Sequence, residues 1–424
     1  MTAHSDSDKW RPKLTYKKSP QPRTARIGAL LCLSLSMLLA SLGTSIANIA
    51  LPTLALSFDA PFHRVQWVVI SYLAALTLFV VLAGRLGDQF GRQRMLVLGL
   101  VLFSLTSALC GLASSLWMLI AARALQGVGA AFLMTLTIAL VRETVGGARV
   151  GRTMGLLGTM SAVGTALGPS LGGLLIGQFG WPSVFLVLAP ISLLAAGLAH
   201  SSLPAGPPSV KSPRIGPFAL RANDIIPHLT ANFLAANMMM ATLLLGPFYL
   251  GFALGLPPAM VGLVMSIGPA ISICTGVPSG RVVDTWGSPR ILLIGLLALA
   301  AGSFALSALP VMFGVGGYIT AIVILTPGYQ LFQSANNTLV MADVPEDQRG
   351  AVSGLLGLSR NLGLIFGASV MGKVFSFGAG ADHIENATSG SIAHGMQLTF
   401  VIAGTSVVAA LWYMRRFPPN RVEY

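Results

Sequence analysis

The sequence predicts an all-α membrane protein with twelve transmembrane helices in two six-helix bundles and with both termini in the cytoplasm. Three observations lead to this fold class: an apolar composition, twelve long apolar runs, and a loop sequence that occurs once in each half of the chain. Repeated topology with repeated loop chemistry is typical of secondary transporters, which are built from related helical bundles.

The composition places the chain in the bilayer. Hydrophobic residues make up 54% of the 424 residues and charged residues only 9%, whereas soluble domains carry about 25% charged residues. The net charge of +13 does not indicate nucleic-acid binding, because the basic residues lie beside the apolar runs. We therefore expect an integral multi-pass protein of the plasma (inner) membrane, with the lipid bilayer as its surroundings and no nucleic acid as a partner.

Each apolar run is close to or longer than the ~20 residues that span a bilayer. The predicted helices are 27–56, 66–84, 93–113, 117–142, 152–177, 182–203, 225–252, 258–280, 290–309, 314–341, 350–377 and 393–414. Most of the 26 basic residues flank these runs on one side, and only Arg64 and Lys373 fall on the other. The positive-inside rule then puts both termini in the cytoplasm.

The same pattern predicts the division of the chain. Residues 1–26 are expected to form a disordered basic cytoplasmic tail, and residues 415–424 a second tail. A Pro-rich cytoplasmic loop, 204–224, separates an N-terminal bundle, 27–203, from a C-terminal bundle, 225–414.

The repeated loop sequence lies between the second and third apolar run of each half. Gly84–Arg94 and Gly280–Arg290 share Gly, Arg, Asp, an aromatic residue, Gly and Arg at the same relative positions. We expect Gly84 and Gly91 to form tight turns and Asp88 to accept hydrogen bonds from helix N-terminal amides and nearby Arg side chains. The predicted gating loop comprises Gly84, Arg85, Asp88, Gly91, Arg92 and Arg94, with Asp284 and Arg290 in the second copy.

The 152–177 helix carries glycines at four-residue spacing. Gly164, Gly168 and Gly172 form a small-residue face that lets helices approach closely, Gly173 adjoins it, and Pro169 bends the helix. We expect this face to seal the two halves of the protein on the outer side, beyond ordinary tight packing.

Two arginines lie inside the apolar runs, whereas all thirteen acidic residues fall in tails, loops or helix ends. A buried Arg in a bilayer is costly and usually faces a cavity or a polar partner, although a structural bond to backbone carbonyls would also explain Arg123. Two buried cations without a buried anion favour an anionic or neutral hydrogen-bonding substrate over a cation. Polar side chains on several helices complete the predicted substrate or coupling site. Together with the two arginines, the predicted site comprises Arg123, Gln126, Arg360, Asn361, Thr44, Ser45, Asn48, Tyr72, Asn237, Gln330, Gln333 and Asn337. Met238–Met240 is interpreted as core or lipid-facing packing.

Four motifs resemble the major facilitator superfamily, and the resemblance covers nearly the whole chain. They are the 84–94 loop, the Arg123–Gly129 segment, the Gly164–Gly173 segment, which is similar to the antiporter signature of the family's exporters, and Asn48-Ile-Ala50-Leu51-Pro52, which is typical of drug/proton antiporters of the fourteen-helix type. The resemblance implies alternating access, a gating role for Asp88 and proton-driven export of a small molecule such as a drug.

The chain also departs from that pattern. It has twelve readable helices instead of fourteen, and Gly43 stands where related exporters carry an Asp in the first helix. An Asp placed at position 43 is expected to favour export of lipophilic cations by restoring a buried anion. A facilitator or importer of a neutral or anionic solute stays open as an alternative, and a membrane enzyme or sensor is a remote one. We expect no catalytic residue, cofactor or metal, and a monomer.

Overall fold

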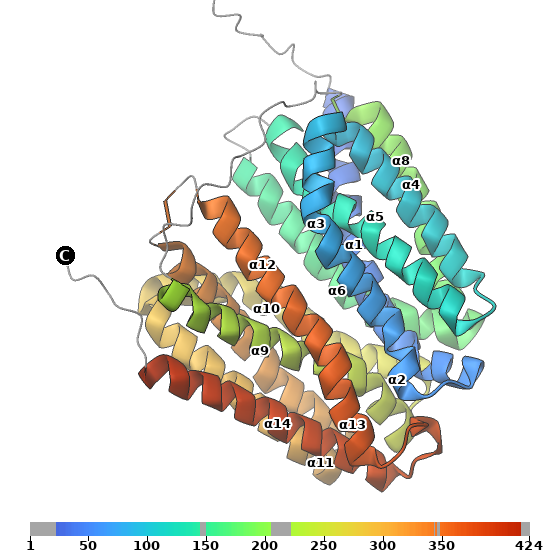
Figure 1. Cartoon of the computed structure of the whole chain (residues 1–424), viewed down its shortest axis with the longest axis vertical. Coiled ribbons are helices and arrows are strands. Elements are labelled where there is room, and N and C mark those ends of the chain that lie inside the picture. Colours follow the sequence, from blue (N-terminus) through green and yellow to red (C-terminus); the bar gives the residue numbers. More distant parts are fainter. Residues whose placement is uncertain (1–22, 145–149, 205–221, 343, 346–347, 417–424) are drawn as a thin grey trace, which may run out of the picture.

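The computed structural model describes residues 23–144, 150–204, 222–342, 344–345 and 348–416, and within these ranges it contains helices and no strand (Figure 1). The predicted tails before residue 23 and after residue 416, and most of the predicted central loop, lie outside the described residues. The elements are α1 (Arg23–Phe58), α2 (Phe62–Val65), α3 (Trp67–Phe90), α4 (Arg92–Gly111), α5 (Leu116–Thr144), α6 (Val150–Phe179), α7 (Ser183–Leu186), α8 (Leu188–Ser202), α9 (Ala222–Phe248), the π-helical turn η2 (Tyr249–Ala253), α10 (Pro258–Trp286), α11 (Ser288–Ala342), α12 (Arg349–Phe366), the π-helical turn η3 (Gly367–Met371), α13 (Gly372–Ala379), the 3₁₀ turn η4 (Ile384–Asn386) and α14 (Ser389–Arg416).

The twelve predicted spans are present in the described part of the chain. Eleven helical segments there are long and apolar enough to cross a membrane. One of them, α11, consists of two helices that meet at Gly314, where φ is 55° and ψ is −131°. This conformation is open to glycine, which lacks a Cβ atom. Dividing α11 at Gly314 gives twelve spans and confirms the predicted all-α fold with twelve transmembrane helices.

The helices form two groups (Figure 1). The first group runs from α1 to α8, and in it α1 packs against α6 and α8 while α5 packs against α3 and α4. The second runs from α9 to α14, and in it α11 packs against α10 and α14 while α12 packs against α9. We call these groups the first and second bundle. Contacts between α6 and α10, and between α1 and α9, join them.

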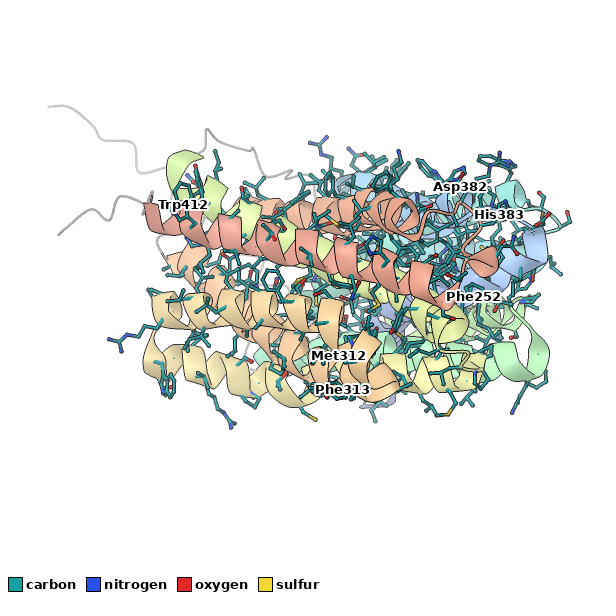
Figure 2. The ribbon with its side chains drawn as sticks, turned by 90° about the horizontal axis from the view of Figure 1, so that it is seen from below. Phe252, Met312, Phe313, Asp382, His383 and Trp412 are labelled. Atoms are coloured by element: carbon teal, nitrogen blue, oxygen red, sulfur yellow. The ribbon has the colours of Figure 1, made fainter. Side chains whose placement is uncertain are left out.

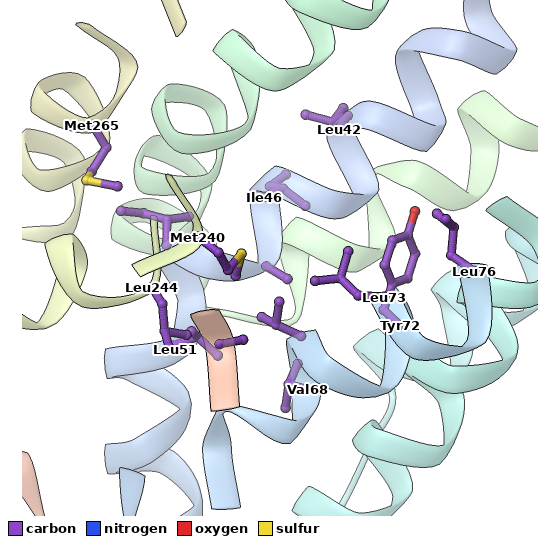
Figure 3. Packing of buried hydrophobic residues seen from close by; sticks show 14 of the residues in the cluster. Leu42, Ile46, Leu51, Val68, Tyr72, Leu73, Leu76, Met240, Leu244 and Met265 are labelled. Atoms are coloured by element: carbon purple, nitrogen blue, oxygen red, sulfur yellow. The ribbon is translucent and has the colours of Figure 1, made fainter. Parts of the chain in front are cut away.

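A continuous apolar cluster extends from one bundle into the other. Figure 3 shows Ile46 of α1 and Leu73 of α3 near Met240 and Leu244 of α9, and all four side chains belong to one cluster of buried residues. Burial of this apolar surface gives the interior its close packing.

Large apolar side chains also cover the outside of the helices. Met312 and Phe313 of α11 and Trp412 of α14 are 69%, 64% and 63% exposed (Figure 2). A soluble protein rarely exposes apolar surface on this scale. These side chains have the lipid tails of a bilayer as their natural surroundings.

The helix that precedes each copy of the predicted gating loop is longer than its apolar run. The α3 helix continues through Gly84 and Asp88 to Phe90, and the chain turns only at Gly91, where φ is 95°. The expected turn at Gly84 is therefore wrong. Gly84 is helical, because backbone hydrogen bonds continue beyond the apolar run until the positive φ of Gly91 ends them. The second copy behaves alike: α10 continues to Trp286, and Gly287, with φ 83°, ends it.

Candidate functional site

A cavity of about 500 Å³ lies between the two bundles. The α1, α3, α5 and α6 helices line it from the first bundle, and α9, α10, α11 and α12 line it from the second. Central cavities between bundles are typical places for small-molecule sites in helical transporters.

The first bundle contributes hydroxyl and amide groups from α1. Thr44 Oγ1 donates to Ala40 O at 3.0 Å, and Ser45 Oγ lies 3.3 Å from Gly164 O of α6. Asn48 Nδ2 donates to Thr44 O at 3.3 Å, while its Oδ1 atom is buried without a hydrogen-bond partner among the described residues. These three predicted residues all line the cavity.

The second bundle contributes the charge. Arg360 and Asn361 of α12 and Gln330 of α11 line the cavity, as predicted residues, and Arg360 is exposed there. Among the described residues that line the cavity, Arg360 is the one charged side chain. The carboxylates that the structure describes lie elsewhere. The cavity is thus apolar over most of its wall and positive at one place.

The remaining predicted residues lie away from the cavity lining. Tyr72 is buried and donates its hydroxyl hydrogen to Ala40 O at 3.1 Å. Asn237 of α9 is 0% exposed, and both polar atoms of its side chain lack partners among the described residues. Gln333 and Asn337 belong to α11, and Asn337 is exposed outside the lining.

Arg123 of α5 also lies outside the cavity. It belongs to a buried polar cluster inside the first bundle, together with Gln126 and Tyr72. Its side chain is 0% exposed. Its Nε atom donates to Val68 O at 3.0 Å, and its Nη1 atom donates to Gly43 O at 3.1 Å and to Gln126 Oε1 at 2.6 Å. The guanidinium lies 4.1 Å from the centre of the Tyr72 ring. These bonds offset the cost of burying the charge and tie α5 to α1 and α3.

Gly43 faces this buried polar cluster and not the cavity. A Cβ atom at Gly43 would lie 3.0 Å from Phe103 Cζ and 3.2 Å from Tyr72 Oη. A carboxylate at position 43 would therefore meet Arg123 and its neighbours. The expectation that an Asp at position 43 would attract cationic substrates is therefore not supported, because its carboxylate would not face the cavity.

The outer end of the cavity is closed; we use "outer end" for the end of the molecule that carries α2, following the orientation predicted from charge. The Phe62 ring of α2 lies 4.8 Å from that of Phe248 and 5.5 Å from that of Phe375, both in the second bundle. Phe62 N also donates to Asp382 O at 2.9 Å. These contacts join the bundles on one side of the cavity.

The small-residue face of α6 contributes to this closure at one place. Gly164, Gly168 and Gly172 pack against α1, within the first bundle. Gly173 faces α10 instead: a Cβ atom there would lie 2.5 Å from Pro258 O and 3.0 Å from Gly262 Cα. Pro169 contacts Gly262 of α10 through its carbonyl oxygen. The contact between bundles therefore belongs to Pro169 and Gly173.

Asp88 and Arg92 of the predicted gating loop form an ion pair. Arg92 Nη2 lies 2.7 Å from Asp88 Oδ1, and Arg92 Nε lies 3.0 Å from the same oxygen. Gly87 packs against the Leu136 side chain of α5, while Arg85 and Arg94 are exposed. In the second copy Asp284 and Arg290 are both exposed, and these two described residues form no equivalent pair.

Several cavity residues were absent from the sequence prediction. Tyr318, Thr326 and Tyr329 line the cavity beside Gln330, and they continue its polar stripe along α11 at helical spacing, a signal that was present in the sequence. Met239 and Met240 line it too, a contact that the interpretation of this segment as core or lipid-facing packing did not include. Met238 and Met240 are both buried in the apolar cluster, as core packing predicts.

The model of the Major Facilitator Superfamily matches residues 33–368 of this chain, most of its length. This protein belongs to the Major Facilitator Superfamily. It is a multi-pass membrane transporter for small molecules, not an enzyme, and the superfamily assignment with its spans places it in the cytoplasmic membrane.

Relatives in the superfamily carry several names. The riboflavin transporter RibZ of Clostridioides difficile is 28% identical, over 82% of this chain and 88% of its own. The multidrug efflux pump LfrA of Mycolicibacterium smegmatis is 27% identical, over 82% and 80%. The tetracenomycin C resistance and export protein of Streptomyces glaucescens is 25% identical, over 82% and 75%.

Solved structures agree in fold. A bacterial homologue of the human lysosomal transporter Spinster, in an inward-facing and unoccupied conformation, aligns with a TM-score of 0.78 at 16% identity, over 95% of this chain and 99% of its own. A D-xylose–proton symporter aligns with a TM-score of 0.74 at 17% identity, over 93% and 98%.

Proposed function

We propose that this protein is a secondary active exporter of small organic molecules, which works by alternating access and uses protons as the coupling ion. The observation that carries the proposal is the cavity of about 500 Å³ that residues of both bundles line, with ring contacts between the bundles at the outer end. Each chain supplies both walls of the cavity, so a monomer suffices as the transport unit.

The cavity chemistry favours a neutral or anionic substrate. Arg360 is the charged residue of the described lining, and Asn361 and Gln330 offer hydrogen bonds. A lipophilic cation would be desolvated there without a countercharge, which is costly. Met239 and Met240 add flexible apolar surface that can adapt to substrates of different shape.

In this proposal the outer contacts and the gating loop control the two states of the transporter. The structure is closed at the outer end through Phe62, Gly173 and Gly262. The Asp88–Arg92 pair of the gating loop belongs to the opposite end, where it would hold the cavity shut when the outer end opens. Breaking the Asp88–Arg92 ion pair would change the relative populations of the two states.

The proposed direction of transport rests on the relatives. Proteins named as a multidrug efflux pump and as an export protein match more than four fifths of this chain, which supports export. The relative named as a riboflavin transporter keeps a facilitator or importer of a neutral solute as the second candidate.

The test is transport by energised inverted vesicles with a panel of cationic, neutral and anionic compounds, with and without a protonophore. We expect uptake of neutral or anionic compounds that falls at least about tenfold on uncoupling, because the proton gradient supplies the driving force. Vesicles without the protein are the control. Uptake that is unaffected by the protonophore would contradict proton-coupled export and favour the facilitator.

A further inference from the structure

Three potential metal-ligating side chains from distant parts of the sequence meet at the outer end. Asp59 follows α1 of the first bundle, whereas His383 and Glu385 lie between α13 and α14 of the second. One ligand atom from each of the three residues can be chosen so that all lie within 4.8 Å of one another. Figure 2 shows His383 beside Asp382 at the end of the molecule opposite Trp412.

Glu385 is the unusual member of this cluster. Its side chain is only 8% exposed, and His383 Nδ1 lies 2.7 Å from its Oε1 atom. Its Oε2 atom is buried and has no hydrogen-bond partner among the described residues. A buried carboxylate oxygen without a donor is costly, and a cation bound at this oxygen would remove that cost.

We propose that Asp59, His383 and Glu385 bind a divalent transition-metal ion of the Zn²⁺ class, which links the two bundles at the outer end. An imidazole nitrogen with two carboxylates suits Zn²⁺, whereas Mg²⁺ and Ca²⁺ prefer oxygen ligands throughout. Zn²⁺ with ligands at about 2.0–2.2 Å in a tetrahedron needs ligand atoms about 3.3 Å apart. The ligand atoms lie within 4.8 Å of one another and Asp59 is exposed, so side-chain rotation at Asp59 would bring the cluster to this spacing.

The position of the cluster gives the metal a consequence for transport. Phe62 N donates to Asp382 O beside it, so the segment that carries His383 and Glu385 already touches the first bundle. A metal held by residues of both bundles stabilises the closed outer end relative to the state in which that end opens. The slowing of transport by the metal rests on the proposed function, whereas the binding itself does not.

The binding test uses the purified full-length protein in detergent, stripped of metal with a chelator and freed of any histidine tag. Zn²⁺ is titrated while the melting temperature is recorded for the wild type and for Asp59→Asn, His383→Ala and Glu385→Gln. Asn tolerates the positive φ of 44° at Asp59, and Gln keeps the acceptor for His383. His63→Ala, an exposed histidine of α2 at the same end, is the matched control.

We expect Zn²⁺ to raise the melting temperature of the wild type and of His63→Ala. Each of the three cluster variants should need at least about tenfold more Zn²⁺ for the same shift. Equal Zn²⁺ dependence in the wild type and the cluster variants, or no shift in any protein, would overturn the site. Loss on changing His383 and Glu385 but not Asp59 would overturn the link between the bundles.

The transport arm adds Zn²⁺ to the face that carries His383 and measures the rate for a compound that the wild type transports. We expect slowing in the wild type and in His63→Ala, and at least about tenfold lower sensitivity in His383→Ala. Unchanged transport at a Zn²⁺ concentration that saturates binding would overturn the effect on the bundles. If no compound in the panel is transported, the proposed function fails, and the melting experiment still decides the metal site.

Discussion

At the residue scale, the two arginines inside the spans have different surroundings. Arg123 is 0% exposed and donates to Val68 O, Gly43 O and Gln126 Oε1, whereas Arg360 is exposed to the cavity. The sequence shows that both residues lie within apolar runs, and this predicted their importance. It cannot show which one reaches backbone carbonyls, because every neighbouring helix offers carbonyls and the periodicity of α5 does not fix the direction of a long side chain.

The positions of Gly43 and Thr44 allow a paired test of cavity charge. Thr44 lines the cavity, and Gly43 faces Phe103 and Tyr72. We expect Thr44→Asp to raise transport of lipophilic cations about tenfold, since it adds a countercharge in a partly desolvated site. Gly43→Asp should leave cation transport unchanged or lower it, because its carboxylate meets Arg123 and crowds Phe103.

Transport rates in vesicles, normalised to the amount of folded protein, decide between these outcomes. A gain in cation transport by Gly43→Asp but not by Thr44→Asp would contradict the placement of the two residues. Thr44→Ser, which keeps the hydroxyl group, serves as the control for substitution at that position.

At the element scale, α6 makes two kinds of contact with one stripe of small residues. Three glycines bring it onto α1, and Gly173 with Pro169 brings it onto α10. The four-residue spacing predicted a close helix contact correctly. It did not separate the two partners, because neighbouring positions on one helix face can meet different helices.

Two glycines one helical turn apart on α6 test the contact between the bundles. Nothing lies within 4 Å of a Cβ atom added at Gly177, whereas one at Gly173 meets Pro258 O and Gly262. We expect Gly173→Leu to lower transport at least about tenfold, because the outer end cannot close around the larger side chain. Gly177→Leu, the matched control, should transport like the wild type.

Transport normalised to folded protein again gives the answer, with monodispersity in detergent as the check on folding. If the two variants transport equally well, or are equally impaired, the Gly173–Gly262 contact does not control closure of the outer end.

The ends of the helices show where hydropathy stops being informative. The apolar runs predicted helix ends near residues 84 and 280, but α3 and α10 continue to Phe90 and Trp286. Hydropathy marks the part of a helix that lies in lipid, and a helix continues until a residue such as Gly91 breaks it. The repeated loop sequence therefore describes two helix ends with their turns.

At the scale of the whole molecule, the sequence predicted twelve spans and two bundles, because the bilayer forces every spanning segment to be apolar and helical. Half of the predicted substrate residues line the cavity, among them Thr44, Asn48 and Arg360. The sequence could not show that the others lie away from the cavity, since packing between the bundles decides which face of each helix lines it. The Asp59–His383–Glu385 cluster depends on the same packing and left no local pattern in the sequence.

The central claim is that Arg360 gives this cavity its preference for neutral and anionic molecules, and Arg360→Gln tests it most directly. Transport of matched anionic and neutral compounds is measured in vesicles for the wild type, Arg360→Gln, Arg360→Lys and Arg64→Gln, an exposed control at the outer end. We predict that Arg360→Gln lowers anion transport at least about tenfold and spares the neutral compounds, that Arg360→Lys is intermediate, and that Arg64→Gln matches the wild type. Anion transport that is unchanged in Arg360→Gln, or that falls together with neutral transport, would contradict the claim.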